Sequence, residues 1–303
     1  MKNFFKNALL LALLTGLFAS CSKDDDMVPT KKTNDKTAIL LVTFGSSYTG
    51  PEKSFANIEE EVKKAYPNDD ISWAFTSHII RNKLIKNGVG PFKDIDSPEE
   101  AMKKLKESGY KKIVVQSLHV IPGSEFNDLK KKVEEFRSNN PTIKMPLGTP
   151  LMNTDDDMKQ LCDIMVKKFA KEDQTVVMMG HGTKHEANDR YTRVGKFFKD
   201  KDKNFIVGTV EATPGITEVI ADAKQLVSKN ILLMPLMSVA GDHATNDMAA
   251  DFDPKKDKVE DKSWKVLLQE EGYKVTPLMK GLADYDEVVS LWLEHLATAK
   301  KEL

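Results

Sequence analysis

Short apolar runs alternate with segments of helical periodicity along most of the chain. The runs predict strands at 39–44, 71–75, 113–118 and 143–147, and again at 176–179, 205–210, 231–236 and 273–278. Between them, apolar residues recur at helical spacing, for example within 51–66 and 124–136. Such alternation is typical of parallel sheets covered by helices. We therefore predict an α/β fold of two similar, doubly wound domains, each with a parallel four-stranded sheet.

The second half of the chain repeats residues of the first. The run IVVQSLHVIPG at 113–123 aligns with ILLMPLMSVAG at 231–241, an offset of 118 residues (231 minus 113). A repeat of this kind indicates two copies of one ancestral unit, related by a pseudo-twofold axis. We expect domains over 38–150 and 151–303, with the carboxyl ends of both sheets around one ligand site.

The first twenty residues differ in kind from the rest. Lys2 and Lys6 precede an apolar segment at 8–18, and small residues lie directly before Cys21. This pattern is typical of a secretory signal, and small residues before a cysteine resemble the lipobox of bacterial lipoproteins, although Phe18 stands where an aliphatic residue is commoner. We predict a signal peptide over 1–20, lipidation at Cys21 and a lipidated flexible tether over 21–37. A plain secretory signal with an incidental cysteine is the alternative.

The acidic run SKDDD at 22–26 bears on the destination of the protein. It resembles the export tag that directs some lipoproteins to the outer surface of a Gram-negative outer membrane; the alternative is a solvated linker. We expect an extracytoplasmic protein, lipid-anchored at the outer membrane, with exposure on the cell surface as a further expectation. The membrane is then a partner through the lipid anchor.

Charge and cysteine content narrow the function classes. The chain carries 45 basic and 46 acidic residues, for a formal net charge of −1, so nucleic acid is not an expected partner. Cys162 falls in an amphipathic helical pattern and is predicted to be a buried apolar residue. A homo-oligomer stays open as a further partner.

Three predicted strands of the second half end on metal-competent side chains. His181 follows the strand at 176–179, Glu211 follows 205–210, and His243 lies in the loop after 231–236. Two imidazoles and a carboxylate suit a divalent ion such as cobalt, iron, nickel or zinc, and three ligands leave positions open for a substrate. The alternative is that a histidine at a strand end serves only as a hydrogen-bonded structural residue.

Several motifs, in order along the chain, resemble the anaerobic sirohydrochlorin cobaltochelatases. They are TFGSSY at 43–48, AFTS at 74–77, QSLH at 116–119, MGHG at 179–182, VE at 210–211, MPLM at 234–237 and AGDHATNDMA at 240–249. That family belongs to the class II chelatases, which are related in fold to ferrochelatase. The resemblance implies a divalent metal, cobalt first, held by His181, Glu211 and His243 between two α/β domains, with a tetrapyrrole beside it.

The resemblance also implies roles for individual residues. His181 and Glu211 are the expected catalytic residues, His181 as the base that accepts a pyrrole proton and Glu211 as a proton relay. The expected tetrapyrrole-binding residues lie near the predicted strand ends of the first half; they are Phe44, Gly45, Ser46, Leu118 and His119. A purely structural role for His119 stays open, and His185 is expected at the surface, with an accessory-ligand role as the alternative.

Two functions follow from these expectations. The first is a chelatase that inserts a divalent metal, cobalt, into a macrocycle such as sirohydrochlorin. Cobalt insertion for corrinoid synthesis belongs in the cytoplasm, however, which disagrees with the predicted address. The alternative is a cell-surface lipoprotein that binds haem or another tetrapyrrole for uptake, with removal of the metal as a further step.

Overall fold

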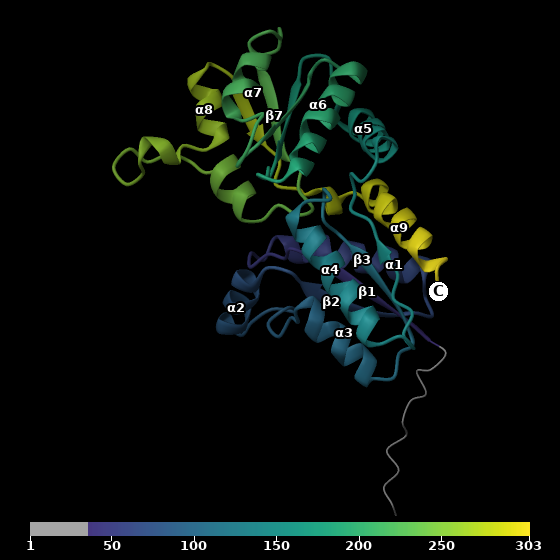
Figure 1. Ribbon diagram of the computed structural model, residues 1–303. Coiled ribbons are helices and arrows are strands. Elements are labelled where there is room, and N and C mark those ends of the chain that lie inside the picture. The colour runs from purple at the N-terminus through teal and green to yellow at the C-terminus, as the bar shows by residue number, and fades with distance from the viewer. Residues whose placement is uncertain (1–35) are drawn as a thin grey trace, which may run out of the picture. The chain divides into compact units, whose positions relative to one another are not determined.

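The structure, a computed structural model, describes residues 36–303 of the chain. The predicted signal peptide, Cys21 and most of the predicted tether lie outside the described residues. Within residues 36–303, no helix is both long enough and apolar enough to cross a membrane. The described part consists of two α/β halves (Figure 1).

The two halves have sheets of the same design. The first sheet contains β1 (Thr37–Thr43), β2 (Asp70–Phe75), β3 (Lys112–Ser117) and β4 (Leu147–Gly148), in the order β2-β1-β3-β4. The second contains β5 (Thr175–Gly180), β6 (Phe205–Thr209), β7 (Asn230–Pro235) and β8 (Lys274–Pro277), in the order β6-β5-β7-β8. All neighbours are parallel, which confirms the two predicted parallel four-stranded sheets.

Helices connect the strands and cover the sheets. In the first half they are α1 (Pro51–Ala65), α2 (His78–Asn87), α3 (Pro98–Glu107) and α4 (Ser124–Asn139). In the second half they are α5 (Asp155–Phe169), α6 (Asp189–Lys201), α7 (Ile216–Ala223), α8 (Trp264–Glu270) and α9 (Asp286–Lys300). Short helical turns are η1 (Glu186–Asn188), η2 (Ala244–Met248), η3 (Val259–Asp261) and η4 (Leu282–Asp284).

The fourth strand is shorter than the apolar run at 143–147 predicts. The segment does run beside β3, because Ile113 N–H donates to the Lys144 carbonyl at 2.9 Å and Val115 N–H donates to the Pro146 carbonyl at 3.0 Å. Pro146 has no N–H with which to continue the ladder, so regular pairing is confined to Leu147 and Gly148. The sequence pattern locates this edge strand correctly but overestimates its length.

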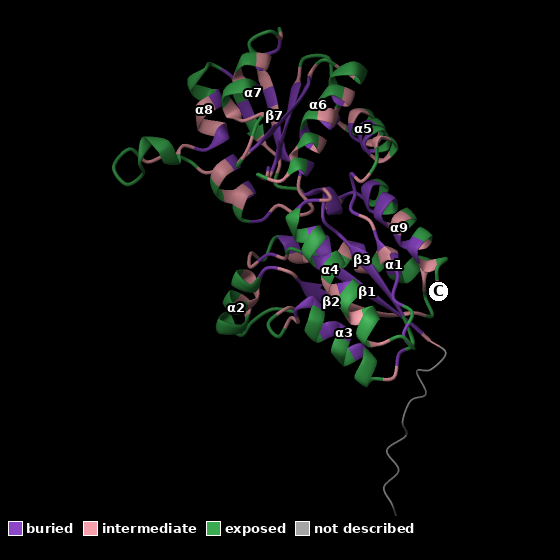
Figure 2. Cartoon of the chain, in the orientation of Figure 1, coloured by how far each residue is buried: buried purple, intermediate pink, exposed green. Residues whose placement is uncertain are grey.

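Central strands are buried on both faces, which explains their continuous apolar runs. In β1, Ile39 and Leu41 belong to one core cluster, whereas Ala38, Leu40 and Val42 belong to another on the opposite face. In β5, Val176 and Met178 join the first of these clusters. Buried residues accordingly gather along the strands, and exposed ones on the outer surfaces of the helices (Figure 2).

The last helix of the chain packs against the first sheet. α9 contacts β3, β4 and α1, and the side chain of Trp292 is 1% exposed. The Trp292 indole N–H donates to the His119 carbonyl at 3.4 Å. A further link comes from Ser54 on α1, whose hydroxyl donates to Asp284 at 2.9 Å. The end of the chain therefore completes the core of the first half.

Cys162 is fully buried in α5, as the helical pattern predicts, and carries a free thiol. Burial raises the pKa of this thiol to about 12. The thiolate, which is the nucleophilic form, is therefore scarce near neutral pH. Cys162 is a core residue rather than a reactive one.

Candidate metal centre

Three loops leave the carboxyl edge of the second sheet and carry the candidate ligands. His181 follows β5 directly, Glu211 comes two residues after the end of β6, and His243 lies in the loop between β7 and η2. Since β5 lies between β6 and β7 in the sheet, the three loops emerge side by side. Residues separated by about thirty positions in sequence are thus neighbours in space.

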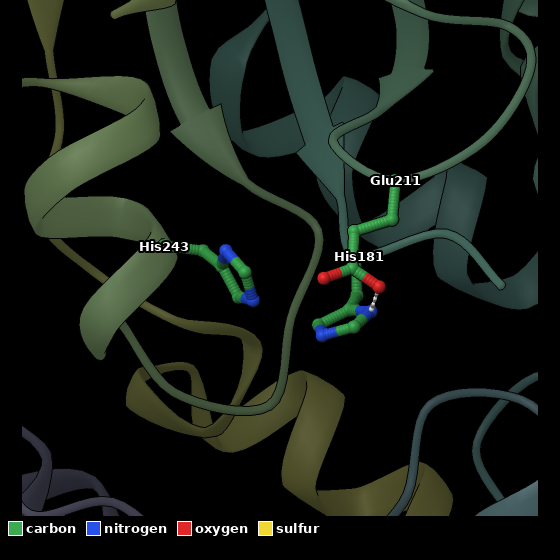
Figure 3. Close-up of side chains that lie close together, drawn as sticks. All are labelled: His181, Glu211 and His243. Atoms are coloured by element: carbon green, nitrogen blue, oxygen red, sulfur yellow. Dashed lines mark ion pairs between the residues drawn. The ribbon is translucent and has the colours of Figure 1, made fainter. Parts of the chain in front are cut away.

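The three side chains converge on one point. One ligand atom from each of His181, Glu211 and His243 can be chosen so that all lie within 4.8 Å of one another. The Nδ1 atom of His181 is 3.7 Å from Oε2 of Glu211, and the two imidazole rings have centroids 4.5 Å apart. Figure 3 shows both rings and the carboxylate facing a common space. Ligand atoms bound tetrahedrally to one zinc-like ion at about 2.0–2.2 Å would lie roughly 3.3–3.6 Å apart, so small side-chain shifts would bring the three groups onto one ion.

Glycines on both sides of His181 make its position possible. A Cβ atom on Gly180 would lie 2.3 Å from the Tyr191 ring, and one on Gly182 would lie 2.9 Å from the Ala212 backbone nitrogen. Gly182 also has φ of +84°, a conformation that favours glycine. The loops are joined by the Glu211 N–H, which donates to the His181 carbonyl at 2.9 Å. Gly180 is therefore required by the packing of the end of β5 against Tyr191 of α6, and Gly182 by the close approach of the first two loops.

Both imidazoles have one nitrogen engaged. Nδ1 of His181 donates to the Gly182 carbonyl at 2.8 Å, and Nδ1 of His243 donates to Oδ2 of Asp247 at the same distance. Because a carbonyl and a carboxylate oxygen only accept, the proton of each neutral ring resides on Nδ1. Each Nε2 is then left with a lone pair that can bind a metal ion.

The centre is partly open to solvent. The side chains of His181 and Glu211 are 43% and 53% exposed, and that of His243 is 27% exposed. Protons, water and a metal ion can therefore reach the ligands without unfolding of the surrounding loops. The arrangement can chemically bind a divalent cation and exchange protons with a second molecule placed against it.

The predicted tetrapyrrole-binding residues occupy different environments. Phe44 is 42% exposed at the end of β1, whereas Ser46 is buried and its hydroxyl accepts a hydrogen bond from Tyr48 N–H at 3.2 Å. Gly45 has φ of +98°, and a Cβ there would meet the Phe75 ring at 2.3 Å. Leu118 is 1% exposed within the shared core. Of these residues, Phe44 is exposed and Gly45 is partly exposed, whereas Ser46, Leu118 and His119 are buried.

His119 is buried and uncharged. Its Nδ1 lies 2.8 Å from the Ser117 hydroxyl, and its Nε2 has no hydrogen-bond partner among the described residues. Burial lowers the pKa of His119 to about 4, so the ring is neutral at physiological pH. His185, for comparison, accepts from Ala187 N–H through Nδ1 and lies 3.1 Å from Asn127 through Nε2. His185 is thus held in a loop and is not grouped with the three candidate ligands.

Sequence reasoning missed the polar residues that surround His243. Tyr48 donates to Asp242 at 2.7 Å, and Asn246 donates to the Tyr48 hydroxyl at 3.2 Å. Asp247 contacts His243 directly. All of these residues except Tyr48 lie in the segment at 240–249. The sequence motif therefore identifies the segment but not the hydrogen bonds that its side chains make.

Comparison with known proteins agrees with this geometry. The family profile described as cobalt chelatase (CbiK) matches residues 37–301. The chain belongs to the cobalt chelatase family. A sirohydrochlorin cobaltochelatase, CbiKC, from Nitratidesulfovibrio vulgaris strain Hildenborough is 34% identical over 271 residues, which cover 88% of this chain and 92% of the relative. A sirohydrochlorin cobaltochelatase from Salmonella typhimurium strain LT2 is 34% identical over 269 residues, covering 87% and 96%.

Solved structures share the fold of this cobalt chelatase family member. SirB from Bacillus subtilis with Fe3+ superposes with a TM-score of 0.57 at 15% identity, covering 87% of this chain and 95% of that one. The sirohydrochlorin chelatase SirB from Bacillus subtilis subspecies spizizenii, in complex with cobalt, gives 0.56 at 14% identity, covering 88% and 96%. The predicted chelatase-like fold and the resemblance to the cobaltochelatases are both confirmed.

Proposed function

We propose that this protein inserts a divalent metal ion, cobalt in the first instance, into sirohydrochlorin or a closely similar tetrapyrrole. The observation that carries the proposal is the convergence of His181, Glu211 and His243 within 4.8 Å at the carboxyl edge of the second sheet. Membership of the cobalt chelatase family supports it, as do two relatives named sirohydrochlorin cobaltochelatases. The metal ion is a substrate in this reaction and leaves with the product.

The ligand set suits temporary binding of the ion. Two neutral imidazoles and one carboxylate bind borderline divalent ions, and three protein ligands leave coordination positions for water and for a pyrrole nitrogen. Iron, nickel and zinc share these preferences, so the same three ligands can also bind those ions. A half-exposed centre allows the ion to be passed to a macrocycle without complete burial of its charge.

Metal transfer and proton transfer are coupled by charge balance. A divalent ion that enters a neutral macrocycle displaces two N–H protons, so M²⁺ and H₂L give ML and two H⁺. As the ion leaves, His181, Glu211 and His243 lose a ligand bond and become free bases. We assign His181 as the base that accepts a pyrrole proton and Glu211 as the relay to solvent. His181 suits this role because its Nδ1 is fixed by Gly182 and its Nε2 is available.

The first half supplies the surface for the macrocycle in this proposal. Phe44 presents an exposed aromatic ring at the end of β1, and apolar rings can stack on a tetrapyrrole face. Gly45 and Ser46 shape the turn that presents Phe44. Leu118 and His119 are buried, so we assign them the support of this surface from below.

Cobalt insertion is tested with the full-length protein, metal-free sirohydrochlorin and Co²⁺, followed by absorption spectroscopy. The expected result is conversion of the free macrocycle to its cobalt complex faster than in the absence of protein. A parallel sample receives haem. A stable Soret shift with haem, together with no insertion of cobalt, would contradict the chelatase proposal and favour a haem-binding lipoprotein instead.

A further inference from the structure

Asp247 contacts His243, one of the three candidate metal ligands. Its Oδ2 atom lies 2.8 Å from Nδ1 of His243, and no second ion pair of Asp247 exists within residues 36–303. His243 directly precedes the short π-helical segment η2, and Asp247 lies within it. A π-helical turn is rare and occurs often at functional sites. Here the turn places a carboxylate directly behind an imidazole.

The other acidic and amide side chains of this segment face elsewhere. Asp242 accepts from the Tyr48 hydroxyl at 2.7 Å, and Asn246 donates to Asp242 at 3.2 Å. In this segment, Asp242 and Asn246 therefore make contacts toward Tyr48 of the first half, whereas Asp247 contacts His243.

The two candidate histidine ligands are held differently. The Nδ1 proton of His181 is accepted by the neutral carbonyl of Gly182, whereas that of His243 is accepted by a carboxylate. A carboxylate behind a metal-bound imidazole fixes its tautomer and ring orientation and makes the other nitrogen a stronger donor. Nε2 of His243 should therefore bind a metal ion more strongly than Nε2 of His181.

We propose that Asp247 is a positioning residue for His243: its carboxylate holds the ring so that Nε2 faces His181 and Glu211. This inference rests on the proposed function, because it takes His243 to be a metal ligand. Asp247 acts through His243 and does not itself touch the ion or the macrocycle. Its loss therefore weakens metal binding and alters the coordination of the ion.

The experiment measures Co²⁺ binding alone, without a tetrapyrrole, in the full-length protein. The visible absorption bands of bound Co²⁺ report its coordination, and a competition titration gives the dissociation constant. For Asp247→Ala we expect binding weaker by about 10- to 100-fold, the usual effect of removing such a partner, with changed bands. Asp247→Asn should recover part of the affinity, because its amide oxygen still accepts from Nδ1.

Asp251→Asn provides the matched control. Asp251 lies four residues further along, its side chain is 98% exposed, and it pairs with Lys265 at 2.7 Å rather than with a histidine. It should bind Co²⁺ with the affinity and bands of the wild type. Equal losses in Asp247→Ala and Asp251→Asn would overturn the inference, because the effect would then follow net charge.

The outcomes separate this inference from the function on which it rests. If the wild type and His243→Ala bind Co²⁺ equally, the metal centre itself is wrong. If His243→Ala weakens binding and Asp247→Ala leaves the affinity and the bands unchanged, only the role of Asp247 is wrong. Should Asp247→Ala fail to fold, Asp247→Asn carries the test: weaker binding with changed bands supports positioning, and wild-type behaviour overturns it.

Discussion

Individual residues at the metal centre are constrained more by packing than by chemistry. Gly182 illustrates this, because its positive φ and its contact with the next loop together exclude any larger residue. The sequence signalled His181, Glu211 and His243 because each follows an apolar run, and the strand order then brings them together. It gave no signal for the pairing of Asp247 with His243, since that contact depends on a π-helical turn that apolar periodicity does not encode.

Substitution of Gly182 separates backbone strain from steric collision. Gly272 has φ of +83°, close to the +84° of Gly182, but a Cβ there would meet nothing within 4 Å. Gly272→Ala should therefore lose about 1 kcal/mol of unfolding free energy from strain alone. Gly182→Ala should lose about 1–3 kcal/mol of unfolding free energy beyond the loss in Gly272→Ala. It should also slow cobalt insertion, because the loop that carries Glu211 must shift. Urea unfolding and the insertion assay check both; equal effects of the two variants would disprove the collision.

At the level of elements, the order and type of the strands were predictable from the sequence, but the packing of the last helix on the first sheet was not. Repeated apolar runs identified eight strands, and only the edge strand β4 differs clearly, because Pro146 interrupts its ladder. Nothing in the apolar pattern of α9 indicates that it packs on the first sheet. That packing follows from tertiary contacts such as Trp292 with His119.

α9 is joined to α5 by an ion pair of two largely buried residues. His295 lies 3.2 Å from Asp157, and its other ring nitrogen lies 3.1 Å from the Thr149 carbonyl. Burial alone would lower the pKa of His295, but the hydrogen bond and charge of Asp157 outweigh it, and the pKa is raised. Burial would likewise raise the pKa of Asp157, but the hydrogen bonds from His295 and Thr154 lower it.

These shifts predict the pH dependence of stability. A histidine with a raised pKa stabilises the folded state fully below its unfolded pKa of about 6.5, and that stabilisation is lost as pH rises through the folded value. The aspartate contribution is present above about pH 4 and is lost as pH falls further. His295→Gln should therefore be less stable than the wild type near pH 5–6, with a smaller difference at pH 9. His78→Gln, on the exposed start of α2, is the control; a difference independent of pH would contradict the ion-pair account.

The whole molecule combines a chelatase fold with an unusual predicted start. The fold and family are established for residues 37–301, whereas the signal peptide and lipid anchor remain predictions from the first twenty-six residues. The cellular location matters because a membrane-tethered chelatase would meet its macrocycle outside the cytoplasm.

If Cys21 is lipidated, attachment to the membrane depends on the sulfur atom of this residue. The wild type expressed in a Gram-negative host should incorporate a labelled fatty acid and sediment with membranes. Cys21→Ser should lose the label and move to the soluble or unprocessed fraction, because an anchored acyl chain is the only link to the bilayer in this proposal. Cys162→Ser serves as the control, since Cys162 is buried in α5. Label on the Cys21→Ser variant would rule out this anchor.

The most direct test of the account is the rate of cobalt insertion by a His181→Ala, His243→Ala double variant. The comparison is with the wild type and with His185→Ala, which removes a neighbouring histidine outside the metal centre. The account predicts a loss of at least about 100-fold for the double variant, more than the loss usual for a supporting residue. His185→Ala should retain most of the activity. Insertion by the double variant at the wild-type rate would show that the reaction does not use this centre.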